Sequence, residues 1–219
     1  MPPTPNSENS AAGHDYGNLQ KHLNPNPLQR CLLTRFHRRV VEVARQADAR
    51  RILDAGCGQG FVMHQLDQDG LAGSITGADT DTDALAWGRA HEVAQQPLTA
   101  ANIRRLPFPD HSFDLVLCLE VLEHLPRPAE GLRELLRVSG HYILLSVPHE
   151  PFFRGINFAR GKHIKALGND PEHLQLFTGR AFRRLVADQA RLIWHGYSFP
   201  WQIALAAKHD LPISKPAIQ

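Results

Sequence analysis

The chain has few cysteines and no long hydrophobic run. Its three cysteines, Cys31, Cys57 and Cys118, are scattered and form no Cys-x-x-Cys pair. This argues against both a disulfide framework and a structural zinc site. No stretch approaches about 18 consecutive apolar residues, and the first residues lack the basic and apolar regions of a signal peptide. We therefore expect a soluble chain from a reducing compartment, with the cytoplasm as the default location.

A strong charge of either sign is also missing. The 24 Lys and Arg residues nearly balance the 22 Asp and Glu residues, which leaves a net charge of +2 over 219 residues. This composition lacks the positive footprint of a non-specific nucleic-acid binder, so nucleic acid is not an expected partner. The 13 histidines are many, but only their spacing with other ligands could predict a metal.

The most informative feature is a glycine-rich turn. Residues 52–60 read Ile-Leu-Asp-Ala-Gly-Cys-Gly-Gln-Gly, an apolar strand that ends in an acid and runs into alternate glycines. Because glycine has no Cβ, such a loop adopts left-handed dihedrals and lets a ligand lie against the main chain. A dinucleotide fingerprint needs a further glycine where Phe61 stands, so the spacing argues against a dinucleotide.

A second strand, Ser74–Asp79, also ends in an acid. The carboxyl ends of adjacent parallel strands lie side by side, so Asp79 can accept hydrogen bonds from both ribose hydroxyls of a nucleoside. Asp81 and Asp83 are better explained as the N-cap and the first-turn acid of the helix that follows.

Strand and helix patterns alternate after an amphipathic helix that begins at Leu28. This rhythm predicts a parallel sheet with right-handed crossovers. Two final apolar runs, 191–199 and 201–207, are separated only by Pro200. A connection of one residue permits an antiparallel hairpin but not a crossover. The sheet is therefore predicted to end in an antiparallel strand. The other strands are expected at 51–54, 74–79, 98–101, 113–119 and 141–147, and helices at 61–68, 83–93, 129–138 and 179–189.

The glycine turn, Asp79 and the segment 106–116 resemble the class I S-adenosylmethionine (SAM)-dependent methyltransferases, closely over residues 50–150. Within that family the chain resembles the methyltransferase type 11 group and the ubiquinone-pathway O-methyltransferases. The resemblance implies an α/β fold, a Rossmann-like doubly wound sheet of seven strands with the last strand antiparallel, and SAM as the cofactor. It implies cofactor contacts at Asp54, Gly56, Cys57, Gly58, Gly60, Asp79, Thr80, Asn102, Ile103 and Leu119.

Residues 120–124 read Glu-Val-Leu-Glu-His. If they form a helix, Glu120, Glu123 and His124 share one face, and this donor set suits a divalent cation such as magnesium or manganese. His173 is the candidate fourth ligand. The run resembles those of the ubiquinone-pathway enzymes and the small-RNA 2′-O-methyltransferases. Without a metal, His124 and His173 are the candidate general bases, ahead of His149, and Glu120 completes the predicted catalytic set.

The domain prediction has three parts: a flexible tail at 1–27, a single domain at 28–219 with an N-terminal helix, and an insertion at 151–172. The aromatic and basic residues of the insertion are expected to do one of two things. They line the site of a lipid-like acceptor, or they only hold the insertion against the domain. The predicted function is methyl transfer from SAM to a small or lipid-like acceptor, at oxygen. An RNA 2′-O-methyltransferase and a catalytically silent SAM-binding protein are the alternatives.

Overall fold

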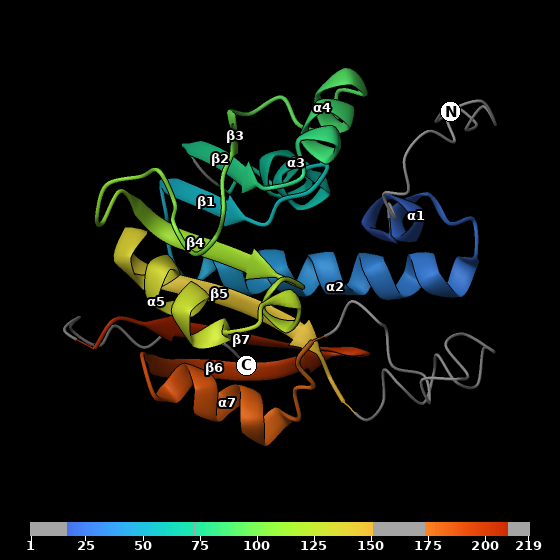
Figure 1. The fold of residues 1–219 in the computed structure, drawn as a ribbon. Coiled ribbons are helices and arrows are strands. Elements are labelled where there is room, and N and C mark those ends of the chain that lie inside the picture. The colour runs from blue at the N-terminus through green and yellow to red at the C-terminus, as the bar shows by residue number, and fades with distance from the viewer. Residues whose placement is uncertain (1–16, 72, 151–173, 210–219) are drawn as a thin grey trace.

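The computed structural model describes residues 17–71, 73–150 and 174–209, in which helices alternate with strands (Figure 1). The predicted insertion and His173 lie outside these residues. The helices are α1 (Gly17–Leu23), α2 (Pro27–Arg45), α3 (Phe61–Gln68), α4 (Thr82–Ala90), the 3₁₀ turn η1 (Leu122–His124), α5 (Pro128–Val138) and α7 (Gly179–Ala187). The strands are β1 (Arg51–Ala55), β2 (Ser74–Asp79), β3 (Leu98–Ala100), β4 (Phe113–Leu119), β5 (Ser139–Pro148), β6 (Arg191–Ser198) and β7 (Trp201–Ala207).

The strands form one seven-stranded sheet in the order β3-β2-β1-β4-β5-β7-β6. β7 runs antiparallel to both β5 and β6, while the pairs from β3 to β5 are parallel. The predicted doubly wound sheet with a reversed last strand is confirmed. Its order changes direction between β1 and β4, and ligands of such sheets bind at the carboxyl ends of the strands beside that point.

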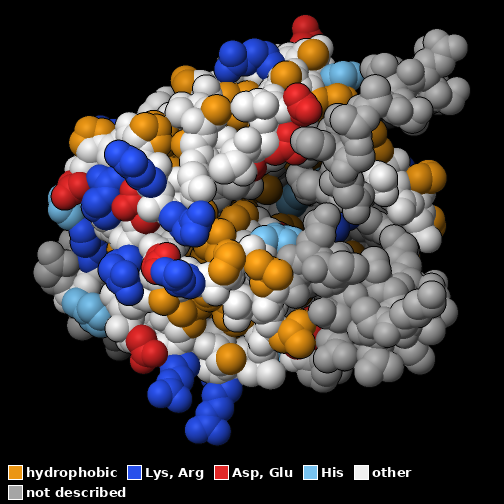
Figure 2. All heavy atoms as spheres, in the orientation of Figure 1, with side chains coloured by type: hydrophobic (Ala, Val, Ile, Leu, Met, Phe, Trp, Pro, Cys, Tyr) orange, Lys and Arg blue, Asp and Glu red, His pale blue; other side chains and the backbone are white. Residues whose placement is uncertain are grey.

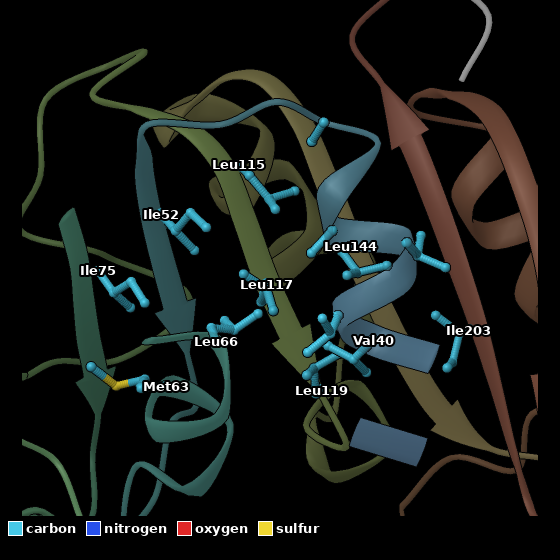
Figure 3. Close-up of a cluster of buried hydrophobic side chains, with 14 of the residues drawn as sticks. Val40, Ile52, Met63, Leu66, Ile75, Leu115, Leu117, Leu119, Leu144 and Ile203 are labelled. Carbon is cyan, nitrogen blue, oxygen red and sulfur yellow. The ribbon is translucent and has the colours of Figure 1, made fainter. Parts of the chain in front are cut away.

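Each face of the sheet is covered by helices, because successive strand residues point to opposite sides. Ile52, Leu115 and Leu117 pack on one face against α2 and α3 (Figure 3). Leu53 and Val116, one residue along in each strand, pack on the other face against α5 and α7. The three layers hold the carboxyl ends of the strands in fixed positions.

The start of helix α2 is fixed by its capping residue and a proline in its first turn. The side chain of Asn26 accepts hydrogen bonds from the amides of Leu28 and Gln29, and Pro27 occupies the first turn, which needs no amide donor. The buried side of α2 includes Phe36, Val40 and Val43, which belong to the predicted amphipathic pattern, whereas Leu28 at the start of that pattern is exposed.

A short helix lies within the predicted tail. Residues 1–27 were expected to be flexible, but Gly17–Leu23 forms α1. The side-chain Nδ2 of Asn18 donates to Gln59 Oε1 at 2.8 Å, and the His22 ring stacks on Phe61 with a centroid separation of 4.0 Å. Seven residues are too few for a stable isolated helix. Tertiary contacts that no local sequence pattern predicts therefore hold α1 within the range expected to be flexible, and the domain boundary at residue 27 stays a prediction.

Charges of both signs are interspersed on the face drawn in Figure 2. Within the described residues, no helix combines the length and the apolar character that crossing a bilayer requires.

Replacing Leu132 by alanine tests the packing of α5 on the sheet. Leu132 is fully buried, so Leu132→Ala should lower the free energy of unfolding by about 2 to 5 kcal/mol, measured by denaturant titration. The matched control is Leu28→Ala in α2, where the side chain is 67 % exposed and the loss should stay within about 0.5 kcal/mol. Equal losses in the two variants would contradict the assigned core.

Candidate functional site

A cavity of about 630 Å³ lies at the carboxyl ends of β1, β2 and β4. The glycine turn, the loop after β3, η1, α1 and α2 complete its walls. It occupies the place that the reversal of strand order predicts for a ligand. The structure brings most of the predicted site residues to this cavity: Asp54, Gly56, Cys57, Gly58, Asp79, Thr80, Asn102, Ile103, Leu119, Glu120 and His124.

Two of the predicted site residues that the structure describes, Gly60 and Glu123, are outside the cavity lining. Gly60 has a φ of +86° at the start of α3, and an added Cβ would stand 2.6 Å from the Cβ of Ala94. Its lack of a side chain therefore lets the start of α3 lie against the connection between α4 and β3. Glu123 is buried, and neither carboxylate oxygen has a hydrogen-bond partner. Burial, and then the charge of Glu120, raise the pKa of Glu123 well above its usual range.

The glycine turn presents its main chain to the cavity. The Gly56 amide donates to the Ala78 carbonyl at 2.7 Å, which ties the turn to β2. Gly56 has a φ of +88°, and an added Cβ would overlap the side chain of Val121. Gly58 has a φ of +51°. Larger residues would be strained at both positions and would fill the space that a ligand needs.

The carboxylate of Asp79 is held in place by the turn. Its Oδ2 accepts from the Gly58 amide at 2.7 Å, and its Oδ1 accepts from the Asp81 amide at 2.9 Å. Each oxygen keeps a further acceptor site, so the carboxylate can still bind two ribose hydroxyls. Asp81 caps α4 as predicted, by accepting from the amides of Asp83 and Ala84 at 3.0 and 2.9 Å.

Asp54 gives the cavity a preference for a cation. Its side chain is buried, and burial together with the charge of Asp79 raises the pKa of Asp54 to about 7. A cationic group beside Asp54 would stabilise its carboxylate. The ammonium group of an amino acid cofactor such as SAM fits this requirement, and the glycine turn leaves room for the rest of the molecule.

The loop after β3 supplies a further wall. The side-chain oxygen of Asn102 accepts from the Arg104 amide at 2.9 Å, which shapes the loop, and Ile103 is buried beside it. That oxygen retains one acceptor site for an exocyclic amine, and the contact with adenine expected from the sequence remains a prediction.

Glu120 projects from the end of β4 in a strained conformation. Its φ of +60° is rare for a residue with a side chain, and such outliers cluster at functional sites. The Ser146 hydroxyl donates to Glu120 Oε1 at 2.9 Å, and the Glu120 amide donates to the Ser146 carbonyl at 3.1 Å. Burial raises the pKa of Glu120 to about 7, while the positive charge of Lys21 acts in the opposite direction.

The helical face predicted for residues 120–124 is not formed. Helical structure in this run is limited to η1, the 3₁₀ turn Leu122–His124, so Glu120 precedes it, and Glu123 is not among the residues that line the cavity. Across residues 17–71, 73–150 and 174–209, no group of three or more His, Cys, Asp and Glu side chains could hold a metal ion. His173 lies outside these ranges, so the four-ligand set stays a prediction.

Further residues that line the cavity, from α1, α2 and β7, were not predicted as site residues from the sequence. Lys21 and His22 come from α1, Leu33, Phe36 and His37 from α2, and Trp201 from β7. The rings of Phe36 and Trp201 lie 4.8 Å apart. The amphipathic pattern of α2 predicted that Phe36 is buried, but nothing local relates it to residue 201. His149, a candidate base, packs on Tyr197 at 4.8 Å between ring centroids and does not line the cavity.

Comparisons with known sequences agree with the site. Residues 53–142 match the family model described as a methyltransferase domain. The ubiquinone biosynthesis O-methyltransferase of Alkalilimnicola ehrlichii is 34 % identical over 113 residues, which cover 48 % of this chain and 44 % of that protein. The enzyme of the same name from Pseudomonas aeruginosa is 33 % identical over 112 residues, with 47 % and 46 % covered. The chain thus spans less than half the length of these relatives.

Solved structures share the fold. Magnesium protoporphyrin IX methyltransferase from Synechocystis, with bound SAH, has a TM-score of 0.62 at 18 % identity, covering 89 % of this chain and all of that one. A small RNA methyltransferase has a TM-score of 0.65 at 18 % identity, covering 82 % of this chain and 26 % of that one. The match of residues 53–142 to a methyltransferase domain and the shared fold of the solved structures agree with the resemblance that the glycine turn carries.

Proposed function

We propose that the protein transfers a methyl group from SAM to a hydroxyl oxygen of a small or lipid-like acceptor. The observation that carries this proposal is a single cavity with two unlike ends. One end holds the glycine turn and Asp79, and the other holds Glu120 with the rings of Phe36 and Trp201. The names of the curated relatives, ubiquinone biosynthesis O-methyltransferases, support oxygen as the acceptor atom and a lipid-like acceptor.

The first end of the cavity would hold the cofactor. When bound there, SAM supplies a methyl group on a positively charged sulfur, which leaves as a neutral thioether. Asp79 accepts from the ribose hydroxyls, Asp54 faces the ammonium group, and the turn at Gly56–Gly58 lies under the chain between them. These contacts fix the direction of the methyl group, and alignment of this kind supplies most of the rate in such transfers.

The second end would hold the acceptor. Leu33, Phe36 and Trp201 offer an apolar surface that excludes water, as expected of a site for an apolar ring or chain. Glu120 is the polar group beside that surface, and Ser146 fixes its orientation. A hydroxyl placed against Glu120 would give up its proton to the carboxylate as its oxygen attacks the methyl carbon. In this proposal the single domain predicted at 28–219 also includes α1.

Changing Asp79 to asparagine tests the cofactor half. Asp79→Asn removes the charge and places an amide where Gly58 and Asp81 donate. Two hydrogen bonds to a charged group contribute about 1.5 to 3 kcal/mol each, so SAM affinity should fall at least about 100-fold. Calorimetric titration measures it. The control is Asp83→Asn, an exposed acid in the same helix region, which should bind SAM as the wild type does. Unchanged affinity in Asp79→Asn would contradict the assignment.

Changing Glu120 to glutamine tests the proton acceptor. Glu120→Gln should lower kcat roughly 10²- to 10⁴-fold and leave SAM affinity within about twofold. In the wild type a raised pKa means that Glu120 is protonated and inactive in acid. The rate constant kcat should therefore rise with pH through about 7, and Glu120→Gln should lose this rise. The assay uses a catechol or phenol panel with labelled SAM. A full wild-type pH profile in the variant would remove Glu120 from the mechanism.

Removal of divalent cations tests the alternative metal set. The described donors do not fit a metal by themselves, because the Ser146 hydroxyl donates to Glu120 and burial raises the pKa of Glu123 well above its usual range. We expect activity to survive dialysis against EDTA. A loss that magnesium or manganese restores would instead support a site made by Glu120, Glu123, His124 and His173.

A further inference from the structure

Lys21 of α1 brings a positive charge into the cavity. Among the described residues, Lys21 and Arg104 are the only lysine and arginine that line it. Arg104 belongs to the loop after β3, in the wall where the adenine of the cofactor is expected. Lys21 is partly buried, so water screens its charge less than that of an exposed lysine. Its role in the cavity is not explained by the groups that hold the cofactor.

The main chain at Lys21 is held by contacts with two other helices. The Nε2 of Gln29 in α2 donates to the carbonyl oxygen of Lys21 at 3.2 Å. The ring of His22, the next residue, stacks on Phe61 at the start of α3 with a centroid separation of 4.0 Å. The side chain of Lys21 therefore starts from a fixed point in the wall of the cavity.

The ammonium group of Lys21 is available to a ligand. None of the ion pairs formed within residues 17–71, 73–150 and 174–209 includes it, and the hydrogen bond at Lys21 is made by its main-chain carbonyl. An ammonium group has three donors. A lysine that faces a cavity with its donors free is suited to an anionic group of the bound molecule, because such charge-assisted hydrogen bonds are the strong ones.

The charge of Lys21 acts at the acceptor end of the cavity, which Glu120, Phe36 and Trp201 line. Burial raises the pKa of Glu120 to about 7, and the charge of Lys21 acts against that rise. At the cofactor end, burial and the charge of Asp79 are the causes of the raised pKa of Asp54. Lys21 and Glu120 thus line the same part of the cavity without forming a direct ion pair, so one ligand can contact both.

We propose that the methyl acceptor carries a carboxylate, which pairs with Lys21 while the hydroxyl of the acceptor lies against Glu120. This inference rests on the proposed function, since it names the class of acceptor for the same cavity. The apolar part of such a molecule would lie on Phe36 and Trp201. The methyl group passes from the sulfur of SAM to the hydroxyl oxygen and the hydroxyl proton passes to Glu120, so the carboxylate of the acceptor is unchanged. The ammonium group also offsets the repulsion between that carboxylate and Glu120.

Matched pairs of acceptors test the anionic group. The ortho, meta and para isomers of hydroxyphenylacetate each differ from the corresponding ethylphenol by a carboxylate in place of a methyl group. With the wild type and labelled SAM, kcat/KM should be at least about tenfold higher for the acid in one or more of these pairs, because only the acid pairs with Lys21. A kcat/KM for the acid that does not exceed that for the ethylphenol in any pair would overturn the proposal.

The variant Lys21→Met tests the cation. It should abolish the preference for the acid and leave kcat/KM for the ethylphenol within about threefold, whereas Lys21→Arg keeps the charge and should keep the preference. The control is Lys208→Met. Lys208 is also partly buried, but it follows the end of β7 that is remote from Trp201, so this variant should behave as the wild type does. An equal loss for acid and ethylphenol in Lys21→Met would mean that Lys21 acts through Glu120, and would overturn the proposal.

Calorimetric titrations separate this inference from the proposed function. SAM affinity should stay within about twofold in Lys21→Met, and a large loss would assign the ammonium group to the carboxylate of the cofactor and overturn the inference. The protein saturated with S-adenosylhomocysteine should bind the acid more tightly than the ethylphenol, and Lys21→Met should lose this difference. If the acid binds in this way but no acceptor is methylated, the proposed function fails and the anion site stands. If the ethylphenols are methylated as well as the acids, the proposed function stands and the inference fails. Acids that neither bind nor react would also overturn it.

Discussion

The hydrogen bond from the Gly58 amide to the carboxylate of Asp79 holds the glycine turn against the end of β2 at the cavity. The glycine turn leaves β1 and Asp79 ends β2, and the bond of 2.7 Å fixes one against the other. The bond from Gly56 to Ala78 adds a second tie between the same elements. Both require a main chain that approaches closely, which only residues without a side chain allow here. The shape of the turn and the position of the acid are thus parts of one constraint.

The arrangement of the glycine turn and Asp79 also determines the electrostatics of the cavity. Asp54 is buried near the end of β1 and Asp79 ends the neighbouring β2, so burial and the charge of Asp79 raise the pKa of Asp54 to about 7. A cation is the natural partner of two close carboxylates. The same logic applies to Glu120, which Ser146 orients and whose pKa is also raised. The cavity therefore has an end that favours a positive group, and the proposed function assigns proton acceptance to Glu120 at the end that Phe36 and Trp201 also line.

The sequence predicted the parts of the site that are local. Asp54, the glycine turn and Asp79 occur within strand ends and turns, whose chemistry a short segment determines. The reversed last strand followed from the single residue between the two final apolar runs. The place of Trp201 did not follow, because β7 inserts between β5 and β6. Helix α1 was missed because contacts with Gln59 and Phe61, distant in sequence, hold it. The helical face expected for Glu120 failed because that residue takes a left-handed conformation, which no spacing rule anticipates.

The most direct test of the account is a crystal structure of the protein with S-adenosylhomocysteine and an acceptor analogue. The account predicts that both ribose hydroxyls lie within hydrogen-bond distance of Asp79, with the thioether sulfur directed towards Glu120 and the analogue against Phe36 and Trp201. A nucleoside bound elsewhere, or a cavity that stays filled by the protein's own side chains, would contradict it.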